Sequence, residues 1–345
     1  MSRAVRRPRP AALLGLTVTL GAALASVVAT SPAGTAGARP PLAAAVAVDR
    51  HAASRPVVAA TPVAPVATAV AGVADAGAVY VLYATSTEGA GPAHVVRQSR
   101  PGPVTVTGGT LPAGADLVRA GDSLWVAGGS APAVYRLDPA RLVLRQRVDL
   151  RLPAEAIAAT PTALWVAGPG RLGRIDLRTG AVTAALPVDG EVTSLSADPA
   201  GRRLYAAATT AGGTVVTERD ARTGALLATR LLGTGAGHLA ATAAGVWVWR
   251  EAAPPAMVRL RPADLRTVAS VAPTPGPGPL RGGLAGTALW VADPTTLSCA
   301  DPLSGRVRAT WASPPPQRVL DADPARVALL AAGRVLVFPS DPRCT

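Results

Sequence analysis

A short apolar motif recurs along the chain, and this repeat constrains the fold more than any other feature. Each copy has an aliphatic residue, usually Leu or Val, followed in most copies by Trp or Tyr and then by further apolar residues. The copies are Val79-Tyr80-Val81-Leu82, Leu124-Trp125-Val126-Ala127, Leu164-Trp165-Val166-Ala167, Leu204-Tyr205-Ala206-Ala207, Val246-Trp247-Val248-Trp249, Leu289-Trp290-Val291-Ala292 and Val327-Ala328-Leu329-Leu330. Their second positions are 45, 40, 40, 42, 43 and 38 residues apart. A period of about 40 residues is typical of one four-stranded propeller blade.

A turn follows the motif in several repeats and divides each repeat into strands. Asp176–Gly180, Asp220–Gly224 and Asp301–Gly305 share this form, in which the Asp side chain accepts backbone N–H groups and the Gly supplies a positive φ. Each repeat then divides into four strands, for example at about 115–119, 123–127, 133–137 and 142–148. We therefore expect an all-β fold.

The tryptophans of the motif predict a core between neighbouring blades. The motif strand is apolar on both faces, as expected for a sheet that is covered on both sides. Trp125, Trp165, Trp247 and Trp290 share its second position and are expected to be buried. Trp249 and Trp311 lie off this position and are candidates for exposed stacking.

Composition removes several alternatives. Charged residues make up 16% of the chain, which leaves little for the polar faces of amphipathic helices. No Lys occurs, so Schiff-base chemistry and a phosphate-binding loop with its lysine are excluded. The net charge is +13, and all 34 basic residues other than His are Arg. We interpret this excess as coding bias on a solvated surface, with binding of anionic partners as the alternative.

The motif and its turn together resemble a known repeat class. Leu-Trp-Val-Ala, a short loop and then Arg-Ile-Asp-x-x-Thr-Gly are similar to YVTN-type and quinoprotein-like propeller repeats, over about residues 66–342. The resemblance implies a seven-bladed β-propeller of four-stranded antiparallel blades, and the weak first and last repeats leave six blades as the alternative. Because the chain ends soon after Val335–Phe338, we expect an N-terminal strand, from Pro56–Ala60 or Leu42–Val48, to close the ring.

The N-terminal region predicts export. Residues 1–38 combine a basic start, an apolar stretch and small residues before position 38, which is typical of a signal peptide, with an uncleaved membrane anchor as the alternative. Residues 39–65 are rich in Ala and Pro and predict a linker, and 66–345 would form the propeller. Export predicts an extracytoplasmic protein in which Cys299 and Cys344, the only two cysteines, form a disulfide. The alternative is one buried and one free thiol.

Candidate ligand-binding residues come from counting back about eight positions from each motif, to where the innermost strand of each blade should begin. These positions hold or lie near Asp116, Glu155, Glu191, His238, Arg281 and Arg318. His238 beside Glu191 could do acid–base work or hold a divalent cation. The alternative for His238 is a solvent-facing residue with no task.

These observations favour a non-enzymatic binding or scaffold module for a protein or a cell-envelope glycan, acting as a monomer and without a cofactor. One alternative is a metal-assisted lyase or hydrolase resembling streptogramin-lyase-type propellers, which use a His, an acidic residue and Mg²⁺; here these would be His238 and Glu191. Another is binding of single-stranded nucleic acid or another polyanion, which steep salt dependence would reveal.

Overall fold

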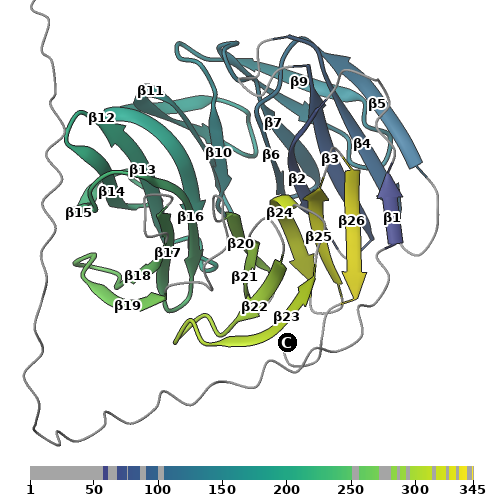
Figure 1. Cartoon of the computed structure of the whole chain (residues 1–345). Helices are drawn as coiled ribbons and strands as arrows, with labels where there is room; N and C mark the ends of the chain where they lie inside the picture. The colour runs from purple at the N-terminus through teal and green to yellow at the C-terminus, as the bar shows by residue number, and fades with distance from the viewer. Residues whose placement is uncertain are drawn as a thin grey trace, which may run out of the picture. The chain divides into compact units, whose positions relative to one another are not determined.

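The computed structural model describes a body made of β-strands (Figure 1). It describes residues 57–60, 68–75, 77–85, 91–99, 105–250, 256–271, 281–285, 288–292, 296–312, 316–323, 326–331, 334–339 and 344. Contacts divide the chain into two units, Met1–Ala47 and Val48–Thr345, and the described residues all belong to the second. The predicted signal peptide (1–38) and the predicted linker (39–65), apart from 57–60, lie outside them. Within the described part, no helix has the length and apolar character needed to cross a membrane.

Five of the sheets have four antiparallel strands each. One contains β2 (Thr68–Ala74), β3 (Ala78–Ala84), β4 (Ala93–Ser99) and β5 (Thr105–Leu111), and the next contains β6 (Asp116–Ala120), β7 (Ser123–Ala127), β8 (Ala133–Leu137) and β9 (Leu144–Asp149). Another contains β16 (Ala236–Thr242), β17 (Gly245–Arg250), β18 (Ala256–Leu260) and β19 (Thr267–Val271), followed by β20 (Arg281–Ala285), β21 (Ala288–Ala292), β22 (Thr296–Ala300) and β23 (Val307–Ala312). The last contains β1 (Val57–Ala60), β26 (Arg334–Pro339), β25 (Arg326–Ala331) and β24 (Pro316–Asp323).

The predicted number of blades is wrong. Besides five four-stranded antiparallel blades, the described strands form one six-stranded sheet of β10 (Ala156–Ala159), β11 (Ala163–Asp176), β12 (Val182–Ala197), β13 (Arg203–Thr210), β14 (Gly213–Asp220) and β15 (Leu226–Leu231). The structure therefore has neither seven nor six separate four-stranded blades. The six-stranded sheet covers two sequence repeats that were expected to form separate blades.

The strand β12 causes this fusion. Its first part pairs with β11 and its second part, from Glu191 onward, pairs with β13. The chain passes between these parts at Gly190, which has a φ of +86°, and a Cβ there would lie 2.2 Å from the carbonyl oxygen of Thr209. Glycine permits this close approach, so the strand continues without the longer loop that separates other repeats.

The sheets form a ring within the second unit. Strand β2 contacts β6, β6 contacts β10, β12 contacts β16, β16 contacts β20, β20 contacts β24, and β24 returns to β2. These are the inner strands of the propeller. Strand β1 pairs antiparallel with β26, so the two ends of the described chain lie side by side and complete the last sheet (Figure 1). Closure by an N-terminal strand, predicted for Pro56–Ala60, is confirmed.

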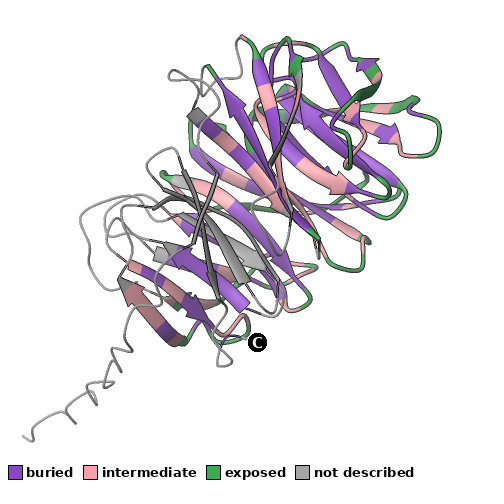
Figure 2. Ribbon diagram, turned by 90° about the vertical axis from the view of Figure 1, so that its right-hand side faces the viewer, coloured by how far each residue is buried: buried purple, intermediate pink, exposed green. Residues whose placement is uncertain are grey.

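The tryptophan column packs one repeat against the next, as predicted. The exposed fraction is 0% for Trp125, Trp165 and Trp247 and 2% for Trp290. Trp249 is also fully buried, so its predicted exposed stacking role is wrong, and Trp311 is half-buried and stacks on Trp290 with ring centroids 5.6 Å apart. Figure 2 shows this burial concentrated in the central strands, with exposed residues in turns and outer strands.

The aromatic residues of this column and the turn residues that pack on them are complementary in size. A Cβ on Gly224 would lie 2.9 Å from Trp165 Cη2, and one on Gly305 would lie 2.8 Å from Trp247 Cη2. The repeat that carries Tyr205 is followed instead by a turn with Leu265 at the glycine position. Leu265 is fully buried although its φ is +52°. Tyr205 and Leu265 belong to one core cluster, so a smaller aromatic residue is matched by a larger turn residue.

Hydrogen bonds reinforce the same contact. The indole N–H of Trp165 donates to the carbonyl oxygen of Ala221 at 3.0 Å, and that of Trp247 donates to the carbonyl oxygen of Pro302 at 2.8 Å. Each bond joins the motif strand of one repeat to the turn of the next. Trp125 is equally buried, but its indole nitrogen has no partner among the described residues.

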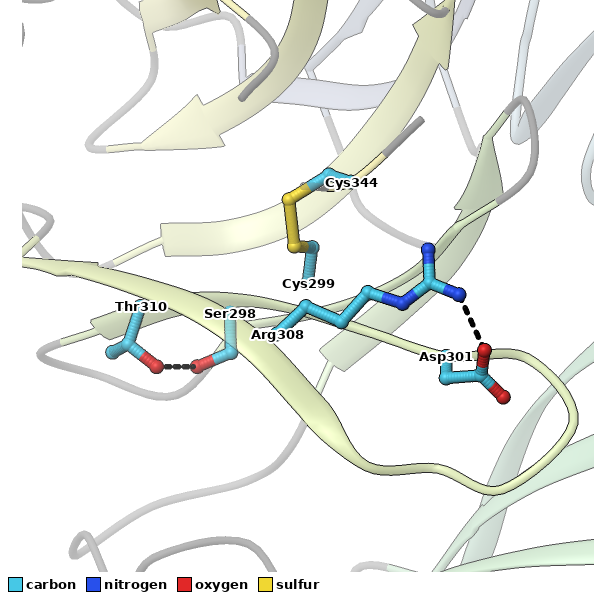
Figure 3. Close-up of a disulfide and its surroundings, with 6 residues drawn as sticks. All are labelled: Ser298, Cys299, Asp301, Arg308, Thr310 and Cys344. Atoms are coloured by element: carbon cyan, nitrogen blue, oxygen red, sulfur yellow. Dashed lines mark hydrogen bonds and ion pairs between the residues drawn. A yellow bond between two sulfur atoms is a disulfide. The ribbon is translucent and has the colours of Figure 1, made fainter. Parts of the chain in front are cut away.

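A disulfide joins Cys299 in β22 to Cys344 near the C-terminus (Figure 3). Both cysteines are buried. Next to Cys299, Ser298 and Thr310 share a hydrogen bond of 3.0 Å between β22 and β23, and Arg308 pairs with Asp301. The predicted pairing is present, and it ties the end of the chain to the sheet before the ring closure.

Candidate functional site

The residues predicted to bind a ligand lie where the inner strands begin, and we call this level of the ring the mouth. The backbone of each one is paired with a neighbouring strand, and for all but Glu155 the partner lies in the C-terminal part of that strand. Asp116 pairs with Ala127, Glu191 with Thr209, His238 with Trp249, Arg281 with Ala292 and Arg318 with Leu330, while the N–H of Glu155 donates to Ala167 at 2.8 Å. Asp116 and Glu191 lie in β6 and β12, and Glu155 directly precedes β10. His238 and the two arginines lie in β16, β20 and β24.

Asp116 has a structural task at the mouth. Its Oδ1 accepts the N–H of Leu117 at 2.9 Å, and its Oδ2 accepts the N–H of Ile157 at 3.2 Å. Ile157 lies in β10, so this carboxylate joins two neighbouring inner strands. Sequence could place Asp116 at the mouth but could not show that its oxygens are engaged there.

Glu155 and Glu191 form the acidic part of the mouth that is open to a ligand. Glu155 is half-buried and Glu191 is exposed. Burial raises the pKa of Glu155, and the negative charge of Glu191 raises it further. When two carboxylates repel each other in this way, an approaching positive charge stabilises their charged forms.

His238 lies on β16, next to the strand that carries Glu191. The two strands are joined by Thr193 Oγ1, which donates to the carbonyl oxygen of Gly237 at 3.3 Å, and by the N–H of Leu239, which donates to Ser194 Oγ at 3.1 Å. His238 is half-buried. Within the described ranges, no three His, Cys, Asp or Glu side chains are grouped so that they could hold a metal ion.

A second concave site lies at the other end of the inner strands and was not anticipated. It is a hollow of about 800 Å³, bordered by the turns after β10, β12, β14, β16 and β18. Its charged lining consists of Arg202, Arg203 and Arg222 together with Asp198 and Asp220. One sequence feature could have indicated this site: the pair Arg202-Arg203 directly follows the turn that begins at Asp198, and the other repeats lack such a pair.

Comparison with known proteins establishes the fold and nothing finer. No family model matches the chain, and no curated protein matches its sequence. Among solved structures, the Neurospora crassa Pan2 WD40 domain is 15% identical, with 84% of this chain and 97% of that chain covered and a TM-score of 0.64. BamB from Moraxella catarrhalis is 14% identical (76% and 82% covered, TM-score 0.51), and Kuenenia stuttgartiensis hydrazine synthase is 13% identical (77% and 93% covered, TM-score 0.57). Together with the ring of antiparallel sheets, these likenesses show that the chain adopts a β-propeller fold.

Proposed function

We propose that this chain is a non-enzymatic, extracytoplasmic binding module that holds a protein partner at its mouth. The carboxylates of Glu155 and Glu191 would receive a basic side chain of that partner. Burial is the main cause of the raised pKa of Glu155, and the charge of Glu191 raises it further. The second part supports the proposal, because it is a repulsion that a bound cation would relieve. A likeness to YVTN-type and quinoprotein-like repeats is part of the proposal and rests on the Leu-Trp-Val-Ala unit.

A protein partner is favoured over a glycan or a nucleic acid by the kind of side chain that is exposed. Bases and sugars are held largely by stacking on exposed aromatic rings. In the described part of the chain, the large apolar residues that are exposed are aliphatic: Val143, Leu144, Val182, Leu226, Leu227, Leu231, Val268, Leu303 and Val307. The tryptophans of the repeat column are buried.

The extracytoplasmic location is supported by two features. The basic and apolar residues 1–38 have the pattern of an export signal. The disulfide between Cys299 and Cys344 fits an oxidising compartment, since such bonds are rare in the cytosol.

The test is the binding of a fluorescent hexapeptide with two arginines to the full chain, followed by anisotropy. A peptide with glutamates in place of the arginines serves as the ligand control. We expect Glu191→Gln to weaken binding of the arginine peptide by about tenfold, because one charge-assisted contact is removed. Asp149→Asn is the matched control, since Asp149 is also exposed but lies on the outer strand β9. Equal weakening by both variants, or equal binding of both peptides, would contradict the proposal.

A further inference from the structure

The hollow at the far end of the inner strands combines guanidinium groups with apolar walls. Pro161 and Pro262 come from turns of different repeats, and Leu227 comes from β15. Its volume of about 800 Å³ lies in the range of small-molecule sites. The fold shapes it tightly, because a Cβ on Gly201, which has a φ of +64°, would lie 2.2 Å from Pro161 Cδ.

The two aspartates of the lining are engaged in their own turns. Asp198 Oδ1 accepts the N–H groups of Arg202 and Arg203, both at 2.7 Å. Asp220 Oδ1 accepts the hydroxyl of Thr223 at 2.8 Å, the N–H of Thr223 at 2.7 Å and the N–H of Arg222 at 3.1 Å. These bonds, the hydroxyl of Thr223 above all, hold the pKa of Asp220 below its usual value. The hydrogen bonds of these carboxylates fix the turns, and the positive charge of Arg222 also contributes to the lowered pKa of Asp220.

Arg203 is held in place by a buried partner. The side chain of Glu218 is fully buried and pairs with the guanidinium of Arg203 at 3.1 Å. Its other oxygen accepts the N–H of Ala263 at 2.7 Å, next to Pro262 in the wall of the hollow. Glu218 thus connects Arg203 to the turn that contains Pro262.

Arg202 and Arg222 are the two guanidiniums left for a ligand. Both are exposed, and their side chains make no hydrogen bond or ion pair within the part of the chain that the structure describes. They project from different turns that border one hollow. Arginine forks match carboxylate and phosphate oxygens in geometry and in charge.

We propose that this hollow binds a small organic molecule through an oxyanion group, carboxylate or phosphate, that is held by Arg202 and Arg222. The apolar part of the ligand lies against Pro161, Leu227 and Pro262. The site is separate from the mouth, so it can be tested without reference to the protein partner.

Isothermal titration of the full chain with phenyl phosphate, benzoate and inorganic phosphate tests this proposal. Phenyl phosphate and benzoate show whether the site prefers a phosphate or a carboxylate. Inorganic phosphate, which has no apolar part, shows how much the apolar walls contribute to binding. We expect at least one aromatic probe to bind, more tightly than inorganic phosphate, and the double variant Arg202→Gln/Arg222→Gln to weaken it by about tenfold or more.

The double variant Arg178→Gln/Arg230→Gln is the matched control for charge. Arg178 occupies the same position in its turn as Arg222, because its N–H also donates to the turn aspartate at 3.1 Å. Arg230 is exposed on β15, and neither Arg178 nor Arg230 lines the hollow. Thermal midpoints without ligand establish that both double variants fold. Failure of both aromatic probes to bind, or an equal loss in the control, would overturn the proposal.

Discussion

The packing of Gly224 against the preceding repeat gives the most specific stability prediction. Its φ is +78°, and a Cβ there would lie 2.1 Å from Leu186 Cδ1 and 2.9 Å from Trp165 Cη2. In Gly224→Ala, the left-handed backbone costs about 1–2 kcal/mol. Overpacking between the repeats adds about 1–3 kcal/mol. We therefore expect the free energy of unfolding to fall by about 2–5 kcal/mol.

Gly233→Ala is the matched control, because Gly233 has a φ of +79° and no atom within 4 Å of the position of its Cβ. It pays the backbone cost alone, about 1–2 kcal/mol. Urea unfolding followed by tryptophan fluorescence measures both variants, and an unchanged slope shows that the midpoints report stability. Equal losses in the two variants would refute the steric contact between Gly224 and the tryptophan column.

Further predictions concern a hydrogen bond, the disulfide and a titration. Trp165→Phe should destabilise the protein by about 1–2 kcal/mol more than Trp125→Phe, because Trp165, unlike Trp125, donates its indole N–H to a partner in the next repeat; equal urea midpoints would contradict this. Cys344→Ser opens a disulfide to Cys299 with a sequence separation of 45, and should lower the free energy of unfolding by about 3–4 kcal/mol, whereas an unchanged thermal midpoint would show that the bond contributes nothing. The pKa of Glu155 is raised above its usual 4.5, so the wild-type chain loses stability as the pH rises from that value through the folded-state pKa. Glu155→Gln should therefore be more stable at neutral pH, with an advantage that disappears in acid; an advantage that grows in acid would reverse the assignment.

The strands could be predicted from the repeat because their pattern is local. The expected strands at about 115–119, 123–127, 133–137 and 142–148 correspond to β6, β7, β8 and β9, with differences of one or two residues. Burial of the tryptophan column followed for the same reason, since its position in the repeat shows which face of the sheet it occupies. Trp249 was misjudged because the cluster that contains it includes Leu289, Val291 and Ala300 of the next repeat, whose position in space the repeat pattern does not show.

The division into sheets could not be predicted from the repeat. Whether two repeats form separate blades depends on the connection between them, and at Gly190 a positive φ keeps β12 continuous through both. The mouth was located by counting along the chain, but the use of Asp116 as a link to Ile157 depends on the distance between sheets. The hollow was missed for a similar reason, because Arg202 and Arg222 come from different turns.

Proton release on binding tests the proposed function most directly. Titration calorimetry of the arginine peptide at mildly acidic pH, in buffers with different ionisation enthalpies, measures the protons that binding displaces from carboxyl groups. A cation that binds beside Glu155 favours the charged form of this carboxyl, whose pKa is raised, so the wild-type chain should release protons and Glu155→Gln should release fewer. Binding without proton release, or the same release from both proteins, would contradict the assignment of the mouth as the partner's site.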